Sequence, residues 1–177
     1  MPTETEVKIK IEAVEPVRQK ILALKAELYK KRALQTDVYF GNPRIRKKDQ
    51  TLKIRDNAIF TYKGPSEKKK NIRSNEEIEI MIDNAAYLQM ILERIGYLPY
   101  WKKERYRESF LLNMTQICID ETPMGNFIEI EGKQENIIDI AKKLGFSQKN
   151  FIAEGYGKLW REYAKKNKLK GDMVFKK

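Results

Sequence analysis

The stretch TETEVKIKIE, residues 3–12, decides the fold, because apolar and charged residues alternate along it without interruption. Val7, Ile9 and Ile11 fall on one face of an extended chain, and charged side chains fall on the other. A period of two is typical of a strand whose two faces meet different environments. We therefore predict a β-strand with one apolar face for packing and one charged face.

The residues that follow predict a helix and then three strands. Four apolar residues recur at three- and four-residue spacing behind Pro16: Val17, Ile21, Leu24 and Leu28. This spacing predicts an amphipathic helix that ends near the basic run at residues 30–32. Short strands are expected at residues 36–40, 51–55 and 58–63, the last two joined by a tight turn at Asp56 and Asn57.

The order of elements then repeats. The Lys-rich residues 65–75 are predicted to form an exposed loop, the best candidate for a mobile lid. A strand at residues 76–82 and a helix that ends at Gly96 follow, with three strands near residues 101–110, 114–120 and 126–131. The pattern of strand, helix and three strands thus occurs twice, about 70 residues apart. Two terminal helices are expected at residues 135–144 and 156–168.

Eight strands with short connections can close on themselves, which leaves no exposed edge. A chain of 177 residues is long enough for one domain with a core and too short for two comfortable ones. We therefore predict a single α+β domain over residues 1–177. Its centre is a closed eight-stranded antiparallel β-barrel with flanking helices, built from two strand-helix-three-strand halves.

Composition limits the chemistry and the partners. The 36 Lys and Arg residues exceed the 25 Asp and Glu residues, and the net charge of +11 favours anionic partners. The chain has no His, which excludes every mechanism that needs imidazole. Cys118 lies in an apolar run, which predicts a buried reduced thiol and a cytoplasmic protein. No apolar run approaches the roughly 20 residues of a membrane span, so we expect a soluble protein with no membrane partner.

Charged residues recur in pairs at positions i and i+2 on five of the predicted strands. The pairs are Glu4 and Glu6, Lys53 and Arg55, Glu77 and Glu79, Lys103 and Arg105, and Glu129 and Glu131. Any single pair is also typical of the solvated outer face of an antiparallel sheet. The whole set favours the barrel interior, because the helices need the apolar faces of the strands.

The expected lining of this interior is close to neutral in total. Its acidic residues are Glu4, Glu6, Glu77, Glu79, Asp120, Glu129 and Glu131, and its basic residues are Lys8, Lys53, Arg55, Lys63, Arg73, Lys103 and Arg105. Converging carboxylates raise one another's pKa unless a cation lies among them, and a hard divalent ion such as Mg²⁺ meets this need. The Lys and Arg residues would then hold a phosphate chain.

The chain resembles the CYTH proteins, also called triphosphate tunnel metalloenzymes, along nearly its whole length. The opening Glu4-Thr5-Glu6-Val7-Lys8 is similar to their ExExK signature. Further similar segments are residues 52–55, 62–65, 73–79 and 102–106, and residues 120–132 resemble class IV adenylate cyclases and their archaeal relatives. Family members often carry Ser-Tyr near the C-terminus, whereas this chain has Gly155 and Tyr156.

The resemblance implies a tunnel that binds a linear triphosphate with Mg²⁺ or Mn²⁺. The implied metal ligands are Glu4, Glu6, Glu129 and Glu131, with Asp120 and Glu79 close to them, and we predict Asp120 as a further metal ligand. The implied phosphate-binding residues are Lys8, Arg55, Lys63, Arg73, Lys103 and Arg105, to which the strand pattern adds Lys53. We expect Lys8, Arg55 and Glu79 to be catalytic; Lys8 is either a phosphate contact or, if neighbouring cations depress its pKa, a general base.

Three functions are open at this point. The first is a phosphohydrolase acting on inorganic, nucleoside or thiamine triphosphate, and the second is a class IV adenylate cyclase that forms cyclic AMP and pyrophosphate. The third is a polyphosphate- or RNA-binding module without turnover, although acidic residues in the groove make nucleic acid an unfavourable partner. Four aromatic residues either stack on a base or pack: Tyr97, Tyr100, Trp101 and Trp160. A homodimer is left open.

Overall fold

The structure is a computed structural model that describes residues 3–176. Its strands are β1 (Thr3–Ile11), β2 (Glu27–Gly41), β3 (Thr51–Arg55), β4 (Ile59–Lys63), β5 (Glu67–Lys69), β6 (Ile72–Met81), β7 (Leu98–Leu112), β8 (Thr115–Thr122), β9 (Gly125–Glu131) and β10 (Phe151–Ile152). Its α-helices are α1 (Val14–Ala23), α2 (Pro43–Lys47), α3 (Ala85–Arg94), α4 (Gln134–Lys143) and α5 (Tyr156–Lys166). A 3₁₀ turn, η1, spans Gln148–Asn150.

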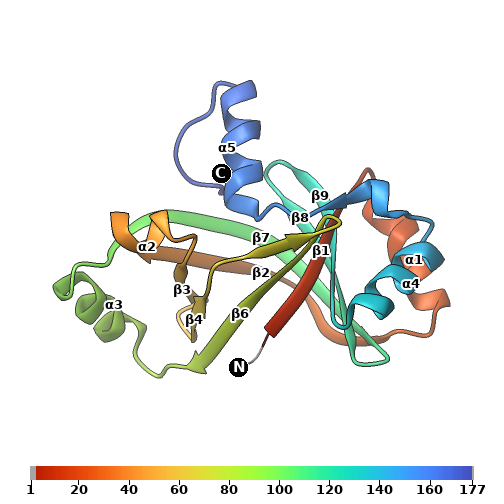
Figure 1. The fold of residues 1–177 in the computed structure, drawn as a ribbon, viewed down its shortest axis with the longest axis horizontal. Coiled ribbons are helices and arrows are strands. Elements are labelled where there is room, and N and C mark those ends of the chain that lie inside the picture. Colours follow the sequence, from red (N-terminus) through yellow and green to blue (C-terminus); the bar gives the residue numbers. More distant parts are fainter. Residues whose placement is uncertain (1–2, 177) are drawn as a thin grey trace.

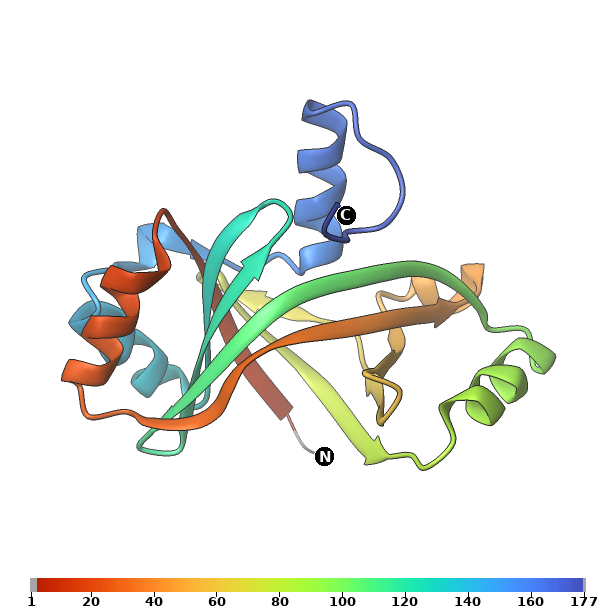
Figure 2. The same cartoon turned by 180° about the vertical axis from the view of Figure 1, so that it is seen from behind.

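Eight strands form a closed antiparallel barrel in the order β1-β9-β8-β7-β2-β3-β4-β6. The ring closes where β6 pairs with β1, with Glu4 opposite Asn75 and Glu6 opposite Arg73. The short strands β5 and β10 add to β6 and β1. Figures 1 and 2 show β2 and β7 as two long paired strands that run across the molecule. The expected α+β fold with an eight-stranded barrel is confirmed.

The apolar strand faces pack outward against the helices. Ile9 of β1 and Ile128 of β9 are buried in one cluster with Ile21 of α1 and Ile137 of α4, and Figure 1 shows these two helices together at one end of the molecule. At the opposite end, α3 contributes Leu92 to a smaller cluster on the outer side of β2 and β3. Full burial of such a side chain stabilises the fold by about 1.5–3 kcal/mol. The charged strand faces are therefore left to the interior.

The first helix is shorter than the sequence predicts. It ends at Ala23, and residues 27–32, expected as its basic end, belong to β2 and pair with β7. Lys25 has a positive φ of 62°, which takes the chain out of the helix. The expected helix end was wrong because pairing of these residues with the long strand β7 outweighs their helical spacing. Leu28 fits that spacing by chance and is 49% exposed, so it does not pack as a helix residue would.

The expected loop at residues 65–75 is largely a hairpin of β5 and β6. Lys70 and Asn71 form its turn with positive φ values of 52° and 61°. Ser74 and Asn75 then pair with β1 and close the barrel, a long-range requirement that the polar composition does not reveal. The turn at Asp56 and Asn57 is confirmed, since both have positive φ, as a type I′ turn requires.

Cys118 is free and buried, as predicted. Within residues 3–176, every helix is too short or too polar to cross a membrane.

Candidate active site

The barrel encloses a cavity of about 710 Å³, lined by the inward side chains of the strands and by the first turn of α5. Every site residue predicted from the sequence lines it, except Asp120. Lys and Arg outnumber Asp and Glu in this lining by about two to one, because mostly exposed cations join the residues predicted from the sequence. The additional cations are Lys30, Arg46, Lys68, Arg107, Lys158 and Arg161. Such a surplus of positive charge favours an anionic ligand.

Three carboxylates gather at one end of the cavity. Oxygen atoms of Glu4, Glu6 and Glu131 lie within 4.8 Å of one another. The strand register explains this, because Glu6 lies opposite Glu131 in the pairing of β1 with β9, and Glu4 follows on the same face of β1. Burial, and next the Glu4 carboxylate, raise the pKa of Glu131 to about 8.

This carboxylate cluster, Glu4, Glu6 and Glu131, fits a hard divalent cation. It offers only oxygen donors, which Mg²⁺ and Mn²⁺ prefer. Burial and the neighbouring Glu4 carboxylate raise the pKa of Glu131 more than Arg107 lowers it, so a cation bound here would stabilise the ionised form. The residues present therefore suit the metal that the sequence predicts.

Lys8 lies between two carboxylates beside this cluster. Its Nζ is 2.9 Å from a Glu6 oxygen and 3.0 Å from a Glu129 oxygen. Burial alone would lower the pKa of Lys8, but Glu129 and Glu6 raise it above its usual value. Lys8 therefore keeps its proton at neutral pH, which argues against the general-base alternative. Glu129 is also paired with Arg105 and Arg107, so it is more heavily neutralised than Glu131.

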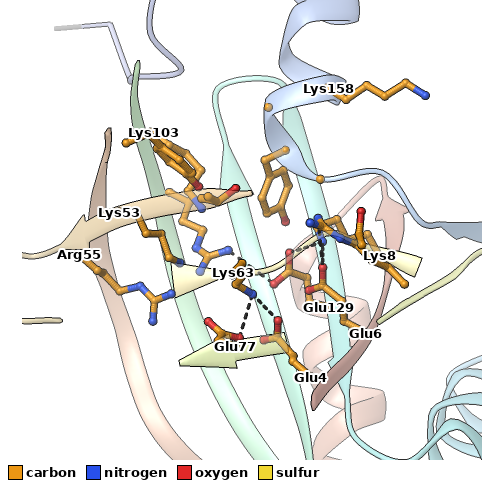
Figure 3. A pocket seen from close by; sticks show the side chains of 18 of the residues that line it. Glu4, Glu6, Lys8, Lys53, Arg55, Lys63, Glu77, Lys103, Glu129 and Lys158 are labelled. Atoms are coloured by element: carbon orange, nitrogen blue, oxygen red, sulfur yellow. Dashed lines mark hydrogen bonds and ion pairs between the residues drawn. The ribbon is translucent and has the colours of Figure 1, made fainter. Parts of the chain in front are cut away.

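Lys63 joins two further carboxylates at the same end. Figure 3 shows its ammonium group between Glu4 and Glu77, the latter 2.9 Å away. Burial acts in the opposite direction, yet Lys63 lowers the pKa of Glu4 to about 2. Burial and the hydrogen bond with Glu4 raise the pKa of Glu77 to about 7. Near neutral pH, Glu77 is therefore protonated part of the time and shares its proton with the Glu4 carboxylate through this hydrogen bond.

The other end of the cavity is cationic and centres on Asp37, which the sequence analysis missed. Its carboxylate is fully buried and lies 2.6 Å from Lys103, 3.1 Å from Arg55 and 3.8 Å from Lys53. Register brings them together, because Asp37 on β2 lies opposite Arg55 on β3 and opposite Lys103 on β7. Burial, against the attraction of Asp37, lowers the pKa of Lys53 to about 8. Arg55 also lies 3.5 Å from Glu79, and burial and the nearby Arg105 lower the pKa of Lys103 well below its usual value. A phosphate bound here would stabilise the charged forms of Lys53 and Lys103.

Asp120 lies behind the cavity wall instead of lining it. It is fully buried and accepts hydrogen bonds from Arg107 at 2.6 Å, Arg105 at 3.1 Å and the Tyr156 hydroxyl at 2.7 Å. Its oxygens are thereby occupied in holding two guanidinium groups. The sequence analysis also missed Arg107, although it continues the two-residue spacing of Lys103 and Arg105.

Glu79 lies on β6, opposite Thr61 of β4. It accepts a hydrogen bond of 2.9 Å from Thr61 and lies 3.5 Å from Arg55. Burial opposes ionisation, but Arg55 lowers the pKa of Glu79 below its usual value. The Glu79 carboxylate is therefore ionised at neutral pH.

The four aromatic residues divide into two pairs. Trp160 is buried and donates to the Gly171 carbonyl at 2.8 Å, while Tyr97 packs beside the α3 cluster. Tyr100 and Trp101 line the cavity, with the Arg46 guanidinium 4.6 Å from the Tyr100 ring and Tyr39 4.7 Å from Trp101. The packing interpretation thus suits the first pair, and the second pair is open to a ligand.

Comparison with known proteins adds a family and a set of relatives. Residues 2–156 match the family described as the CYTH domain. A Methanocaldococcus jannaschii protein named "Putative adenylate cyclase MJ0240" is 29% identical over 169 residues, which cover 86% of this chain and 95% of the relative. PH1819 of Pyrococcus horikoshii is 26% identical, with a TM-score of 0.71 and coverage of 90% and 98%. PH1012 of the same organism, at 24% identity, shares the fold, with a TM-score of 0.76 and coverage of 88% and 98%.

Proposed function

The chain belongs to the CYTH family, and from this premise we propose that it is a divalent-metal-dependent phosphohydrolase whose substrate is a triphosphate, either inorganic or carried by a nucleoside or thiamine. One observation carries the proposal. A carboxylate cluster suited to Mg²⁺ or Mn²⁺ and eight buried or half-buried Lys and Arg residues line the same cavity. Substrate phosphates and a few carboxylates are the ligands that Mg²⁺ usually takes together.

The acidic residues have two proposed roles: some bind the metal ion, and one orients the attacking water molecule. Glu4, Glu6 and Glu131 would hold Mg²⁺ or Mn²⁺, with Glu129 beside them. The bound ion supplies charge neutralisation at a phosphoryl oxygen and a water of lowered pKa. The ionised Glu79 carboxylate orients a water molecule for attack on phosphorus, in the manner of water-positioning residues in phosphoryl transfer.

The basic residues bind the phosphate chain and offset the charge that develops as it is cleaved. Arg55 and Arg105 offer forked donors that match phosphate oxygens, and Lys residues act as point charges. The full set is Lys8, Lys53, Arg55, Lys63, Arg73, Lys103 and Arg105, to which the structure adds Arg107. Asp120 orients Arg105 and Arg107 from behind, so it is not among the metal ligands that we propose.

A class IV adenylate cyclase is the second candidate. The name of the Methanocaldococcus relative supports it, and Tyr100 and Trp101 offer aromatic surface on which an adenine could stack. Incubation of ATP with Mg²⁺ or Mn²⁺ separates the two candidates. Cyclic AMP and pyrophosphate would identify a cyclase, whereas ADP and phosphate would identify a hydrolase.

The metal site is tested by replacing Glu4 and Glu6 with Gln. Loss of two carboxylates should reduce metal-dependent turnover about 100-fold or more, which corresponds to roughly 2.7 kcal/mol of transition-state stabilisation. Anion binding without metal should persist or strengthen, because negative charge is removed from the cavity. The assay uses tripolyphosphate, ATP and thiamine triphosphate with each metal.

Glu12→Gln serves as the matched control, since Glu12 is exposed just after β1 and lies outside the cavity lining. Absence of turnover by the unmodified protein with every substrate and both metals would leave only the binding-module hypothesis. Full turnover in the Glu4→Gln, Glu6→Gln variant would contradict the proposed metal site.

A further inference from the structure

Gly155, the residue directly before α5, lies against the guanidinium group of Arg73. A Cβ atom added at Gly155 would lie 2.7 Å from Nη1 of Arg73, closer than real Cβ contacts come. The backbone itself does not need glycine here, because φ is −71° and ψ is 157°, a conformation open to any residue. A larger residue at position 155 would therefore require the end of the Arg73 side chain to move.

Arg73 has donors that the protein does not use. It comes from β6, opposite Glu6 at the closure of the barrel, and its Nη1 is 3.8 Å from the Glu6 carboxylate, beyond hydrogen-bond distance. Its Nε is buried and finds no hydrogen-bond partner within residues 3–176. An unsatisfied buried donor costs about 1–3 kcal/mol, and more on a charged group. The protein therefore holds the Arg73 guanidinium group only weakly.

Arg73 and Gly155 both line the cavity, on facing elements. Arg73 extends from the barrel wall toward the start of α5, and Lys8 lines the same part of the barrel on the neighbouring strand β1. Glu6 accepts a hydrogen bond of 2.9 Å from Lys8, whereas its distance of 3.8 Å from Arg73 is too long for a second one. Because Nε is buried, only the terminal nitrogen atoms of Arg73, which lines the cavity, could reach the proposed triphosphate.

We propose that Gly155 is a positioning residue for substrate binding: because it has no side chain, the Arg73 guanidinium can extend to the start of α5 and donate to phosphate oxygens there. This proposal rests on the proposed function. It assigns to position 155 a steric role in phosphate binding, exerted through Arg73. Any side chain at position 155 displaces the guanidinium from that place and weakens binding without touching the phosphate chain itself.

The test is a double-mutant cycle on metal-free binding of inorganic tripolyphosphate, measured by calorimetry. Gly155→Ala and Gly155→Ser should each weaken binding about 10-fold or more, as should Arg73→Ala, because a hydrogen bond to a charged group is lost. Combining Gly155→Ser with Arg73→Ala should weaken binding no further than Arg73→Ala alone. In turnover assays, KM should rise more than kcat falls.

Gly157→Ala is the matched control, because its Cβ would meet Trp101 at 3.6 Å, an ordinary contact. Thermal melting checks that each variant is folded, and the smaller alanine variant serves if the serine variant is not. Unchanged binding in both Gly155 variants, or an equal loss from Gly155→Ser with and without Arg73, would overturn this proposal alone. A native chain that binds no tripolyphosphate would overturn the proposed function, and this proposal with it.

Discussion

At the scale of single residues, the partners of each buried Lys determine its electrostatic state. Lys8 has Glu6 and Glu129 within 3.0 Å, and its pKa is raised. Lys53 shares Asp37 with two other cations, and its pKa is lowered to about 8. The same residue type therefore holds its proton firmly at the acidic end of the cavity and loosely at the cationic end.

This difference predicts how phosphate binding changes with pH. Lys53 is charged below pH 8 and loses its proton as the pH rises through 8, so its contribution to tripolyphosphate binding is present at pH 7 and lost toward pH 9. Above pH 8, the contribution of charged Lys53 to the binding constant for tripolyphosphate should fall by up to about tenfold per pH unit.

The Lys53→Arg variant isolates this contribution, because arginine stays charged throughout the range. Calorimetric titration without metal between pH 6.5 and 9.5 should show the two proteins diverging above pH 8. Parallel curves over the whole range would mean that Lys53 does not titrate there.

At the scale of elements, β1 shows why strict alternation matters. Its apolar side chains pack under α1 and α4, and its charged side chains face the cavity. Because α1 and α4 pack against the apolar outer face of the sheet, the charged side chains are directed to the inner face, where they line the cavity. A shift of one residue in register would exchange these two faces and abolish both the core and the site.

The packing of α4 can be tested with Ile137→Ala. Ile137 is fully buried in the cluster that joins α4 to the strands, and its truncation leaves a cavity there. We expect a loss of about 2–5 kcal/mol in the free energy of unfolding, measured by urea denaturation.

Asp139→Ala on the same helix is the comparison. Asp139 pairs with Lys143 at 2.7 Å, but both side chains are more than half exposed, so a loss below about 0.5 kcal/mol is expected. A similar small loss in Ile137→Ala would show that α4 does not contribute a packed core.

At the scale of the whole molecule, barrel closure creates the site. The pairing of β1 with β6 and with β9 brings the N-terminal Glu residues to carboxylates and cations from distant parts of the chain. The net charge of +11 then attracts anions over a longer range. Five cations of the cavity are buried: Lys8, Lys53, Lys103, Arg105 and Arg107. The Lys residues near the C-terminus are exposed: Lys165, Lys166, Lys168 and Lys170.

These two groups of cations should respond differently to substitution. Replacing the four exposed C-terminal Lys residues with Gln should leave the affinity for tripolyphosphate within about twofold at 0.1 M salt, since the Debye length there is about 10 Å. Raising the salt to 1 M should weaken binding several-fold in both proteins. A loss above about tenfold from the four substitutions alone, measured by the same calorimetry, would place the anion site outside the cavity and favour the RNA- or polyphosphate-binding module.

The sequence by itself determined the alternation of the strands, the number of strands in the barrel and most of the buried charged residues of the cavity. It could do so because a period of two assigns each side chain to a face from local information alone. Tertiary structure decided which charges meet. Asp37 joins Lys53, Arg55 and Lys103 only through the register of three strands, and Asp120 is directed at Arg105 and Arg107 behind the wall.

Long-range pairing also decided the two elements that the sequence analysis misassigned, the end of α1 and the hairpin of β5 and β6. In both places, hydrogen bonding to a distant strand outweighs local spacing and composition. The contact between Gly155 and Arg73 belongs to the same class, because more than 80 residues separate the two along the chain and only the closed barrel brings them together. The local sequence pattern determines which face of a strand each side chain lies on, whereas pairing between distant strands determines which side chains lie next to one another.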